Sequence, residues 1–494
     1  MKKVIKIVIR LAKYPLAFLL PVVALGAYGF YSTTQLEMPR PTTLDIPQTG
    51  AGALSTKSFD PTKPTVAIVL GSDRTEITDA LIPYEIFSAA GAYNVYAVAP
   101  ERNVVSVAGG LEVMPDFSYA ELDALLGKSP DLVVIPAFPN VTSPQNQAVL
   151  NWIKQQSARG SYIFSICVGA EAYAATGLLD GRTATTHWGD IDRIEQAYPA
   201  VNWVRGVRYV DGGDYMTSAG ITSGIDAVLH YIAQHNGESV AQAIAQELHY
   251  PGYAFVNSPK VQQESADTAL TAVGLINIVF HWDHASAGVL LYDGVGELDL
   301  ASTFDTYAAT YTTKLLSVSQ TRQLITTKHG LQLVPRYGYS DVPAMERLIV
   351  PGSEARQLAE GSISTWTSNA KAAQVSYLHA DRPDSFAFDA PLRDLAHQEN
   401  IPTAVLNAKR LEYRQGVVQT DGAAWPVWLT IRPLLFGLAS VVLLAVISRR
   451  KPRLLSEAAG TVGARRGAVV ITGGVRQLVA QARSLVTRKG PHQV

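Results

Sequence analysis

Cysteine is almost absent from this chain, which contains one, at position 167, among 494 residues. A single cysteine excludes an intramolecular disulfide, so the folded chain must be stable through its hydrophobic cores alone. Charged residues are also sparse, at 17%, whereas 47% of the residues are hydrophobic. This composition excludes a disordered or fibrous chain, and the length predicts two to four globular domains.

Two long apolar runs lie next to basic chain ends. Residues 14–32 carry no charge and are long enough to cross a bilayer. They have no small-residue cleavage site, so we predict a retained anchor rather than a removed signal peptide. Residues 425–448 form the second run, whose one charge, Arg432, lies near its outer end and can snorkel. The positive-inside bias predicts a two-pass membrane protein with both termini in the cytoplasm and residues 33–424 outside.

The segments around these runs have simpler interpretations. Residues 1–13 hold five Lys/Arg and no acid, and residues 449–494 hold ten Lys/Arg against one acid. Both predict cytoplasmic ends, although the second end also has the apolar spacing of a helix lying on anionic lipid. Residues 33–64 contain five prolines and predict an extended linker. Residues 269–282 are apolar but too short for a usual span, so we predict a packed helix within a linker at 251–284.

The cysteine lies between a strand pattern and a helix pattern. Residues 161–166 predict a short buried strand and residues 168–176 a helix, which places Cys167 on the turn between them. This is the pattern of a nucleophile elbow, and N–H groups at the start of the helix favour a thiolate. His187 follows twenty residues later and is available to orient or deprotonate the sulfur. The alternative is an inert buried cysteine with a structural histidine.

Strands and helices alternate on both sides of Cys167. This alternation predicts βαβ units and a mostly parallel sheet covered on both faces, in a first domain at 65–250. We expect strands at 65–70, 93–99, 104–107, 112–114, 131–135, 161–166, 207–210 and 215–218, and helices at 78–90, 145–157, 168–176, 189–198 and 222–235.

The chain then repeats itself at an offset of 220 residues. Residues 110–115, Gly-Leu-Glu-Val-Met-Pro, reappear at 330–335 as Gly-Leu-Gln-Leu-Val-Pro, and Asp79 matches Asp299. These matches predict a degenerate tandem duplication, with a second domain at 285–420. Where its elbow should fall, the second domain has neither a cysteine nor a turn of small residues, so we expect it to lack the chemistry.

Several motifs around the elbow occur together. Cys167-Val-Gly-Ala is followed by Gly-Leu-Leu-Asp-Gly-Arg at 177–182, Thr-Thr-His-Trp at 185–188 and Thr-Ser-Ala-Gly-Ile-Thr-Ser-Gly-Ile-Asp at 217–226. In combination they resemble the ThiJ/PfpI family of the class I glutamine amidotransferase-like superfamily, and above all the amidase-like domain of AraC-type regulators. The resemblance covers residues 66–226. It implies a flavodoxin-like, doubly wound α/β fold, duplicated here, with a site at the carboxyl ends of the strands.

The resemblance also implies a catalytic set of Cys167, His187 and Asp79. Asp79 lies where the family has an acidic residue beside the cysteine, four residues before Pro83, and can hold a proton for the sulfur. Its alternative is an ordinary acid at a helix N-terminus, and Glu76 is the less well placed substitute.

At the oxyanion hole this chain departs from the family. Relatives place two glycines after the strand at 131–135, whereas this chain has Ala137 and Phe138, and Val168 replaces the threonine of isonitrile-hydrating relatives. The backbone N–H groups of Ala137 and Val168 remain the expected oxyanion donors. Phe138 narrows the approach, so hydratase activity is the less expected chemistry.

Two functions compete for this site. One is a cysteine-dependent hydrolase or lyase, amidase-like or glyoxalase-like, that acts on a small amide or carbonyl compound. The other is a non-enzymatic sensor or interaction module, which binds a small ligand or registers oxidation of Cys167 in the same pocket. A third possibility is that the domain is a structural scaffold in which Cys167 is buried and inert. No cluster has metal-ligand spacing and no helix-turn-helix module is present, so we expect neither a metal or other cofactor nor nucleic acid.

Pairing is a further implication of the resemblance, because domains of this kind commonly pair. We therefore expect the second domain to cover the first as a built-in partner, giving an intramolecular pseudo-dimer. The resemblance also allows a homo-oligomer.

Overall fold

The computed structural model describes residues 2–37, 57–72, 74–265, 267–369, 373–413 and 421–460. Two compact units are distinguished. One is Val23–Pro433, and the other combines Met1–Val22 with Leu434–Val494. Both predicted domains lie in the larger unit. Of the predicted linker 33–64, residues 38–56 lie outside the described residues, and residues 33–37 belong to a helix rather than to an extended segment. Of the predicted tail 449–494, residues 449–460 are helical and the rest lies outside the described residues.

The first domain is a doubly wound α/β fold, as predicted. Its seven-stranded sheet has the order β10-β11-β7-β6-β1-β2-β5, and the β10–β11 pairing is antiparallel while the others are parallel. The strands are β1 (Thr65–Val69), β2 (Asn94–Ala99), β5 (Phe117–Ser118), β6 (Leu132–Ile135), β7 (Tyr162–Ser165), β10 (Tyr209–Asp211) and β11 (Tyr215–Ser218). Strand β5 was not predicted, and the bounds of the other six agree with the predicted ranges to within one or two residues.

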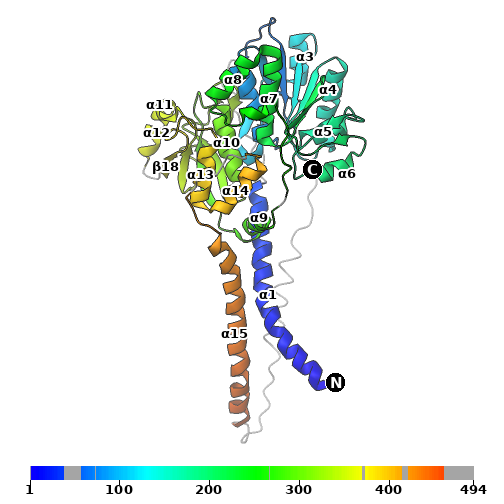
Figure 1. Cartoon of the computed structure of the whole chain (residues 1–494). Helices are drawn as coiled ribbons and strands as arrows, with labels where there is room; N and C mark the ends of the chain where they lie inside the picture. The colour runs from blue at the N-terminus through cyan, green and yellow to red at the C-terminus, as the bar shows by residue number, and fades with distance from the viewer. Residues whose placement is uncertain are drawn as a thin grey trace, which may run out of the picture. The chain divides into compact units, whose positions relative to one another are not determined.

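Helices cover both faces of this sheet because its strands are apolar on both sides. In β1, Val66 and Ile68 belong to the core that includes α2 (Ile77–Ala89) and α7 (Ile221–Asn236). Ala67 and Val69, which alternate with them, belong to the opposite core. That core includes α3 (Tyr119–Leu126), α4 (Gln147–Ala158), α5 (Gly169–Ala175) and α6 (Ile191–Ala197) (Figure 1). The chain continues through α8 (Glu238–Glu247).

The second domain has a smaller parallel sheet with a corresponding strand order. The order β16-β13-β12-β17-β18 repeats β5-β2-β1-β6-β7 of the first sheet. The strands are β12 (Ala285–Leu290), β13 (Thr313–Ser319), β16 (Tyr337–Gly338), β17 (Arg347–Val350) and β18 (Gln374–Tyr377). The helices are α10 (Glu297–Ala308), α11 (Ala355–Leu358), α12 (Glu360–Thr367), α13 (Asp389–Gln398) and α14 (Ile401–Arg410).

The two domains meet through equivalent elements. Helix α2 packs against α10, and their residues share one hydrophobic core. Strand β4 (Glu112–Met114) pairs antiparallel with β15 (Gln332–Leu333), so Val113 lies opposite Leu333, its counterpart at an offset of 220. With β3 (Val105–Ser106) and β14 (Ile325–Thr326), these strands form one four-stranded sheet. The contact therefore has the form of a two-fold pairing of similar domains.

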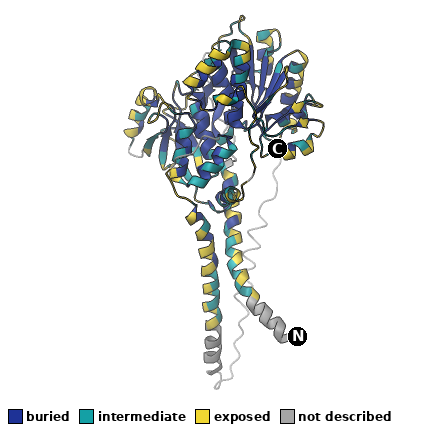
Figure 2. Cartoon of the chain, viewed as in Figure 1, coloured by how far each residue is buried: buried dark blue, intermediate teal, exposed yellow. Residues whose placement is uncertain are grey.

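Two long helices contain the predicted spans. Helix α1 (Lys2–Glu37) includes Ala12–Leu36, and helix α15 (Val427–Gly460) includes Val427–Arg449, each long and apolar enough to cross a membrane by length and composition. Large apolar side chains are exposed along both helices (Figure 2). Helix α9 (Thr268–Phe280) instead packs on α14, where Asn277 donates to the hydroxyl of Thr403 at 3.1 Å.

Candidate cysteine site

Cys167 lies on the turn between β7 and α5. Its backbone has φ +55°, a left-handed conformation that costs energy for any residue but glycine. Gly169 lets this turn approach β6, because a Cβ atom there would lie 2.1 Å from the carbonyl oxygen of Ile135. The hydroxyl of Thr186 donates to the carbonyl oxygen of Cys167 at 2.8 Å. The cysteine is thus held in a strained strand-turn-helix arrangement and is 6% exposed.

Asp79 and Ala137 are brought together at the ends of α2 and β6. The N–H of Ala137 donates to Oδ2 of Asp79 at 3.1 Å. Glu76 caps α2 by accepting the N–H of Asp79 at 2.7 Å, and its own N–H donates to the carbonyl of Ala137 at 2.7 Å. The predicted oxyanion donor of Ala137 is therefore already used by Asp79.

Burial and negative charge keep the thiol protonated. Burial raises the pKa of Cys167 well above its usual value, and the carboxylates of Asp79 and Glu76 raise it further. The N–H of Val168, the second expected oxyanion donor, hydrogen-bonds the sulfur and acts in the opposite direction. Burial likewise raises the pKa of Asp79 to about 7. The site therefore holds protons on both its sulfur and its acids near neutral pH.

His187 lies near this site but faces the second domain. Its Nε2 lies 3.1 Å from the carbonyl oxygen of Arg410, and because a carbonyl only accepts, Nε2 carries a hydrogen and donates it there. Its Nδ1 lies 3.3 Å from the nitrogen of Gly189 and 3.5 Å from Oδ2 of Asp190. Within the described residues no hydrogen bond joins His187 to Cys167. The two ring nitrogens have other partners.

Arg410, the last residue of α14, is the site residue that the sequence did not reveal. Its guanidinium pairs with Asp305 of α10, at 3.1 Å for one contact and closer for the other, and lies 3.7 Å from Oε1 of Glu76. The hydroxyl of Thr78 donates to the same Asp305 at 3.0 Å. The second domain thus contributes a carboxyl group, that of Asp305, and a guanidinium, that of Arg410, to the site. No local motif could have found them, since they lie more than 220 residues from Asp79.

Comparison with known proteins identifies the first domain. Residues 64–234 match the model of the DJ-1/PfpI family. The chain belongs to the DJ-1/PfpI family. It is 29% identical over 194 residues to isonitrile hydratase of Pseudomonas putida, covering 39% of this chain and 78% of that enzyme. It is also 29% identical over 158 residues to the HTH-type transcriptional regulator CdhR of Pseudomonas aeruginosa, covering 32% of this chain and 45% of the regulator.

Solved structures with this domain are also similar. A ThiJ/PfpI family protein from Pseudomonas syringae has 20% identity and a TM-score of 0.34, covering 47% of this chain and 85% of that protein. The relatives of the DJ-1/PfpI domain include both enzymes and regulators. The chain spans less than half the length of the regulator, so that protein's activity does not transfer as a whole.

A large cavity adjoins the cysteine site of the DJ-1/PfpI domain. Its volume is about 690 Å³, and it is lined by both domains and by the end of α1. Glu76, Asp305 and Arg410 form one wall, and apolar residues such as Pro139 and Leu316 form others. This space is large enough for a small organic molecule and reaches the charged groups next to Cys167.

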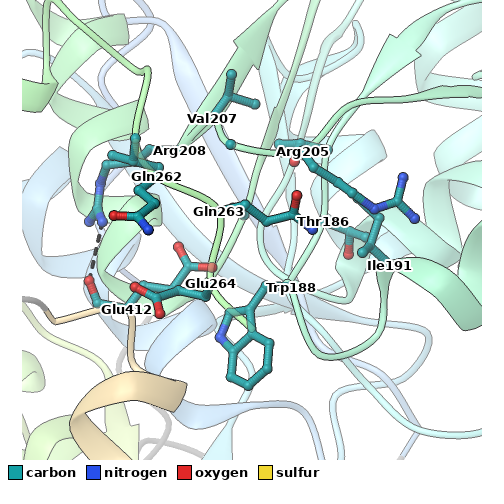
Figure 3. A pocket seen from close by; sticks show the side chains of 14 residues that line it. Thr186, Trp188, Ile191, Arg205, Val207, Arg208, Gln262, Gln263, Glu264 and Glu412 are labelled. Carbon is teal, nitrogen blue, oxygen red and sulfur yellow. Dashed lines mark hydrogen bonds between the residues drawn. The ribbon is translucent and has the colours of Figure 1, made fainter. Parts of the chain in front are cut away.

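A smaller pocket lies beside the loop that carries His187. It has a volume of about 30 Å³, and Trp188, Arg208, Glu264 and Glu412 are among its walls (Figure 3). This volume is enough for about one water molecule rather than a substrate. Of these two spaces, the larger cavity is the one with room for a small organic molecule.

One cluster of potential metal ligands lies between the domains. Atoms of Glu85, Glu297 and His329 lie within 4.8 Å of one another. The two residues of the second domain already pair, because Nδ1 of His329 lies 2.8 Å from Oε2 of Glu297. Burial, and then the charge of Glu297, raise the pKa of Glu85 to about 8. The expectation of no metal site remains a prediction.

The pKa of Asp79 makes stability depend on pH. An unfolded aspartate titrates near 3.8, whereas folded Asp79 titrates near 7, so between these values the folded state binds an extra proton. The free energy of unfolding should therefore fall as pH rises from about 4 to 7, by at most about 1.4 kcal/mol per pH unit for this group. Asp79→Asn should flatten that slope in thermal unfolding monitored by tryptophan fluorescence. The exposed-site control Asp192→Asn should leave it unchanged, and an unchanged slope in Asp79→Asn would contradict the assignment.

Proposed function

We propose that this protein is a membrane-anchored sensor, in which the DJ-1/PfpI domain binds a small ligand and the second domain closes its site. The observation that carries the proposal is the meeting of Glu76 from the first domain with Asp305 and Arg410 from the second, on the wall of a cavity of about 690 Å³. A ligand that binds the carboxyl group of Glu76 competes there with Arg410. Ligand binding and domain closure are then linked.

The groups needed for catalysis support sensing rather than turnover. A cysteine enzyme needs a thiolate, a base and free oxyanion donors. Here the thiol is kept protonated, Nε2 of His187 donates to Arg410, and the N–H of Ala137 donates to Asp79. Each group is occupied within the protein.

The second domain has the features of a built-in partner. Its strand order repeats that of the first, and Val113 pairs with Leu333 on the axis that relates the two. Arg336 of the second domain donates through Nε to Glu112 of the first at 2.9 Å. These contacts support a degenerate duplication that forms an intramolecular pseudo-dimer, as the repeat predicted.

The end of α14 offers a route for the signal. Beyond Arg410, the carbonyl oxygen of Glu412 accepts from Arg208 at 3.2 Å and from Thr222 at 3.0 Å, both in the first domain. The segment that follows α14 leads on to helix α15, which begins at Val427. Displacement of Arg410 would therefore act on the segment that leads to α15. In this proposal α1 and α15 cross the membrane and the domains lie outside the cytoplasm.

Alkylation of Cys167 tests the proposal, because the full-length chain has no other cysteine. In detergent micelles, iodoacetamide should react slowly from pH 6 to 9, with no inflection below about 8.5, the value of a free thiol. His187→Ala should change the alkylation rate less than about twofold, because Nε2 of His187 donates to the carbonyl oxygen of Arg410 and not to the sulfur. The denatured chain, titrating near the free value, is the control. An inflection well below 8.5 that shifts in both His187→Ala and Asp79→Asn would overturn the sensor.

A cysteine-dependent hydrolase or lyase acting on a small amide or carbonyl compound is the second candidate. The left-handed backbone of Cys167 favours it, since strain of this kind gathers at reactive residues. It needs the second domain to open, which would free Nε2 of His187 from the carbonyl oxygen of Arg410. It also needs Asp79, within the first domain, to release the N–H of Ala137. The inflection described above would support this candidate.

A further inference from the structure

A second cavity lies in the second domain, at the place that corresponds to the cysteine site. The strand pairings put His379 two residues beyond β18, as Cys167 lies two residues beyond β7. Asp299 lies in the first turn of α10, as Asp79 does in that of α2. The cavity has a volume of about 220 Å³, and His379 and Asp299 both line it. The second domain has therefore kept a cavity where it lost the cysteine.

His379 closes one side of this cavity as a neutral group. Its Nδ1 accepts the N–H of Gly352 at 3.0 Å, so Nδ1 carries no hydrogen. The hydrogen is on Nε2, which lies 3.0 Å from the carbonyl oxygen of Ala387. The imidazole is thus uncharged and its nitrogens are used within the domain. This wall can enclose a ligand without reacting with it.

Two glycines line this cavity at positions that carry long charged side chains in the first domain. Gly294 and Gly296 lie 220 residues after Arg74 and Glu76, and both glycines line the cavity. Two long charged side chains of the first site therefore have no counterpart here. A cavity of about 220 Å³ has room for roughly seven waters at about 30 Å³ each, or for a molecule of comparable size.

Opposite charges face this space without neutralising each other. Asp299 and Arg382 both line the cavity, but no ion pair joins them to each other in the part of the chain that the structure describes. Oδ1 of Asp299 lies 3.8 Å from Nε2 of His379. Lys328 and Glu247, which also line the cavity, form an ion pair with each other at 3.0 Å.

Three other carboxyl groups line the cavity, those of Glu85, Glu247 and Glu354. Glu85, contributed by the first domain, is buried and accepts the N–H of Leu298. Glu354 lies exposed at the rim, as Arg382 does. The carboxylate of Asp299 and the exposed guanidinium of Arg382 are therefore both available to a ligand, while Lys328 and Glu247 pair with each other.

We propose that this cavity binds a small zwitterion of the α-amino-acid type. Its ammonium group pairs with Asp299 and its carboxylate with Arg382, where guanidinium geometry suits two parallel hydrogen bonds. Glu85 and His379 bound the space between these two contacts. The site is distinct from the cysteine site and needs no nucleophile.

Thermal unfolding of the full-length protein in detergent micelles tests this site. The probes are the twenty α-amino acids and their decarboxylated amines, at millimolar concentration. At least one amino acid should raise the melting temperature, and its amine should bind at least tenfold more weakly. Asp299→Asn and Arg382→Gln should each weaken that amino acid at least tenfold. Arg322→Gln, which removes a guanidinium elsewhere on the second domain, should not.

Cys167→Ser separates this site from the cysteine site. Amino-acid binding should be unchanged in Cys167→Ser, and the alkylation rate of Cys167 should be unchanged in Arg382→Gln. The proposal is overturned if no α-amino acid raises the melting temperature, if the amine binds as well, or if Asp299→Asn and Arg382→Gln bind normally. Loss of binding in Cys167→Ser would place the ligand in the first domain and also overturn it.

Discussion

Replacing Arg208 by methionine should lower the free energy of unfolding by about 3–5 kcal/mol, the cost of leaving one charge of a buried pair without its partner. Arg208 and Asp226 are 2% and 0% exposed and are in direct contact. Arg208 also donates to Thr222 at 2.9 Å and to the carbonyl of Glu412 at 3.2 Å, so the same change loosens the segment after α14 (Figure 3). Denaturant unfolding of the full-length chain at pH 7.5 gives the measurement.

Two companion variants make that result specific. Arg208→Met combined with Asp226→Leu removes both charges and should recover most of the loss, although the hydroxyl of Tyr250, which donates to Asp226 at 2.7 Å, then loses its partner. Arg182→Met breaks an exposed pair with Asp214 and should cost less than about 1 kcal/mol. A loss in Arg208→Met no greater than in Arg182→Met would show that the buried pair contributes little.

Replacing Arg410 by methionine should cost about 3 kcal/mol, at the low end of the range for broken buried pairs, because 30% of its side chain is exposed, on the cavity side. Asp305 is 2% exposed and would be left beside Glu76 with no positive charge. The pKa of Glu76 should then rise further, because the charge of Arg410 now lowers it. Stability should fall more steeply with pH in this variant than in the parent, because the folded state holds protons that the unfolded state releases.

The matched control is Lys409→Met, which changes the neighbouring residue of α14. Lys409 pairs with Glu264 at 3.7 Å and not with the acids around Cys167. Its loss should cost less than about 1 kcal/mol and leave the pH profile unchanged. If Arg410→Met combined with Asp305→Leu is no more stable than Arg410→Met alone, the two charges do not act as a pair. That outcome would remove the main support for closure of the site by the second domain.

The sequence predicted the fold because strands, helices and turns are encoded by local patterns. Alternating apolar segments located β1, β2, β6 and β7 to within two residues. The motif at Cys167 located the turn, and the position of Asp79 before Pro83 located the acid that lies at the end of β6. The apolar runs located the two long helices. The repeat at an offset of 220 located a second sheet of corresponding order.

The partners within the site were decided by tertiary packing. Arg410 reaches Glu76 across more than 300 residues of sequence, and the ring of His187 donates to the backbone of that same arginine. A charged residue at the end of a helix looks alike in sequence whether it faces water or a buried acid, so no local pattern marks it. His379 could be matched to Cys167 only through the register of β18. The two long apolar helices and the turn at Cys167 were thus determined by the sequence, whereas the packing of two domains decided which groups meet at the cysteine.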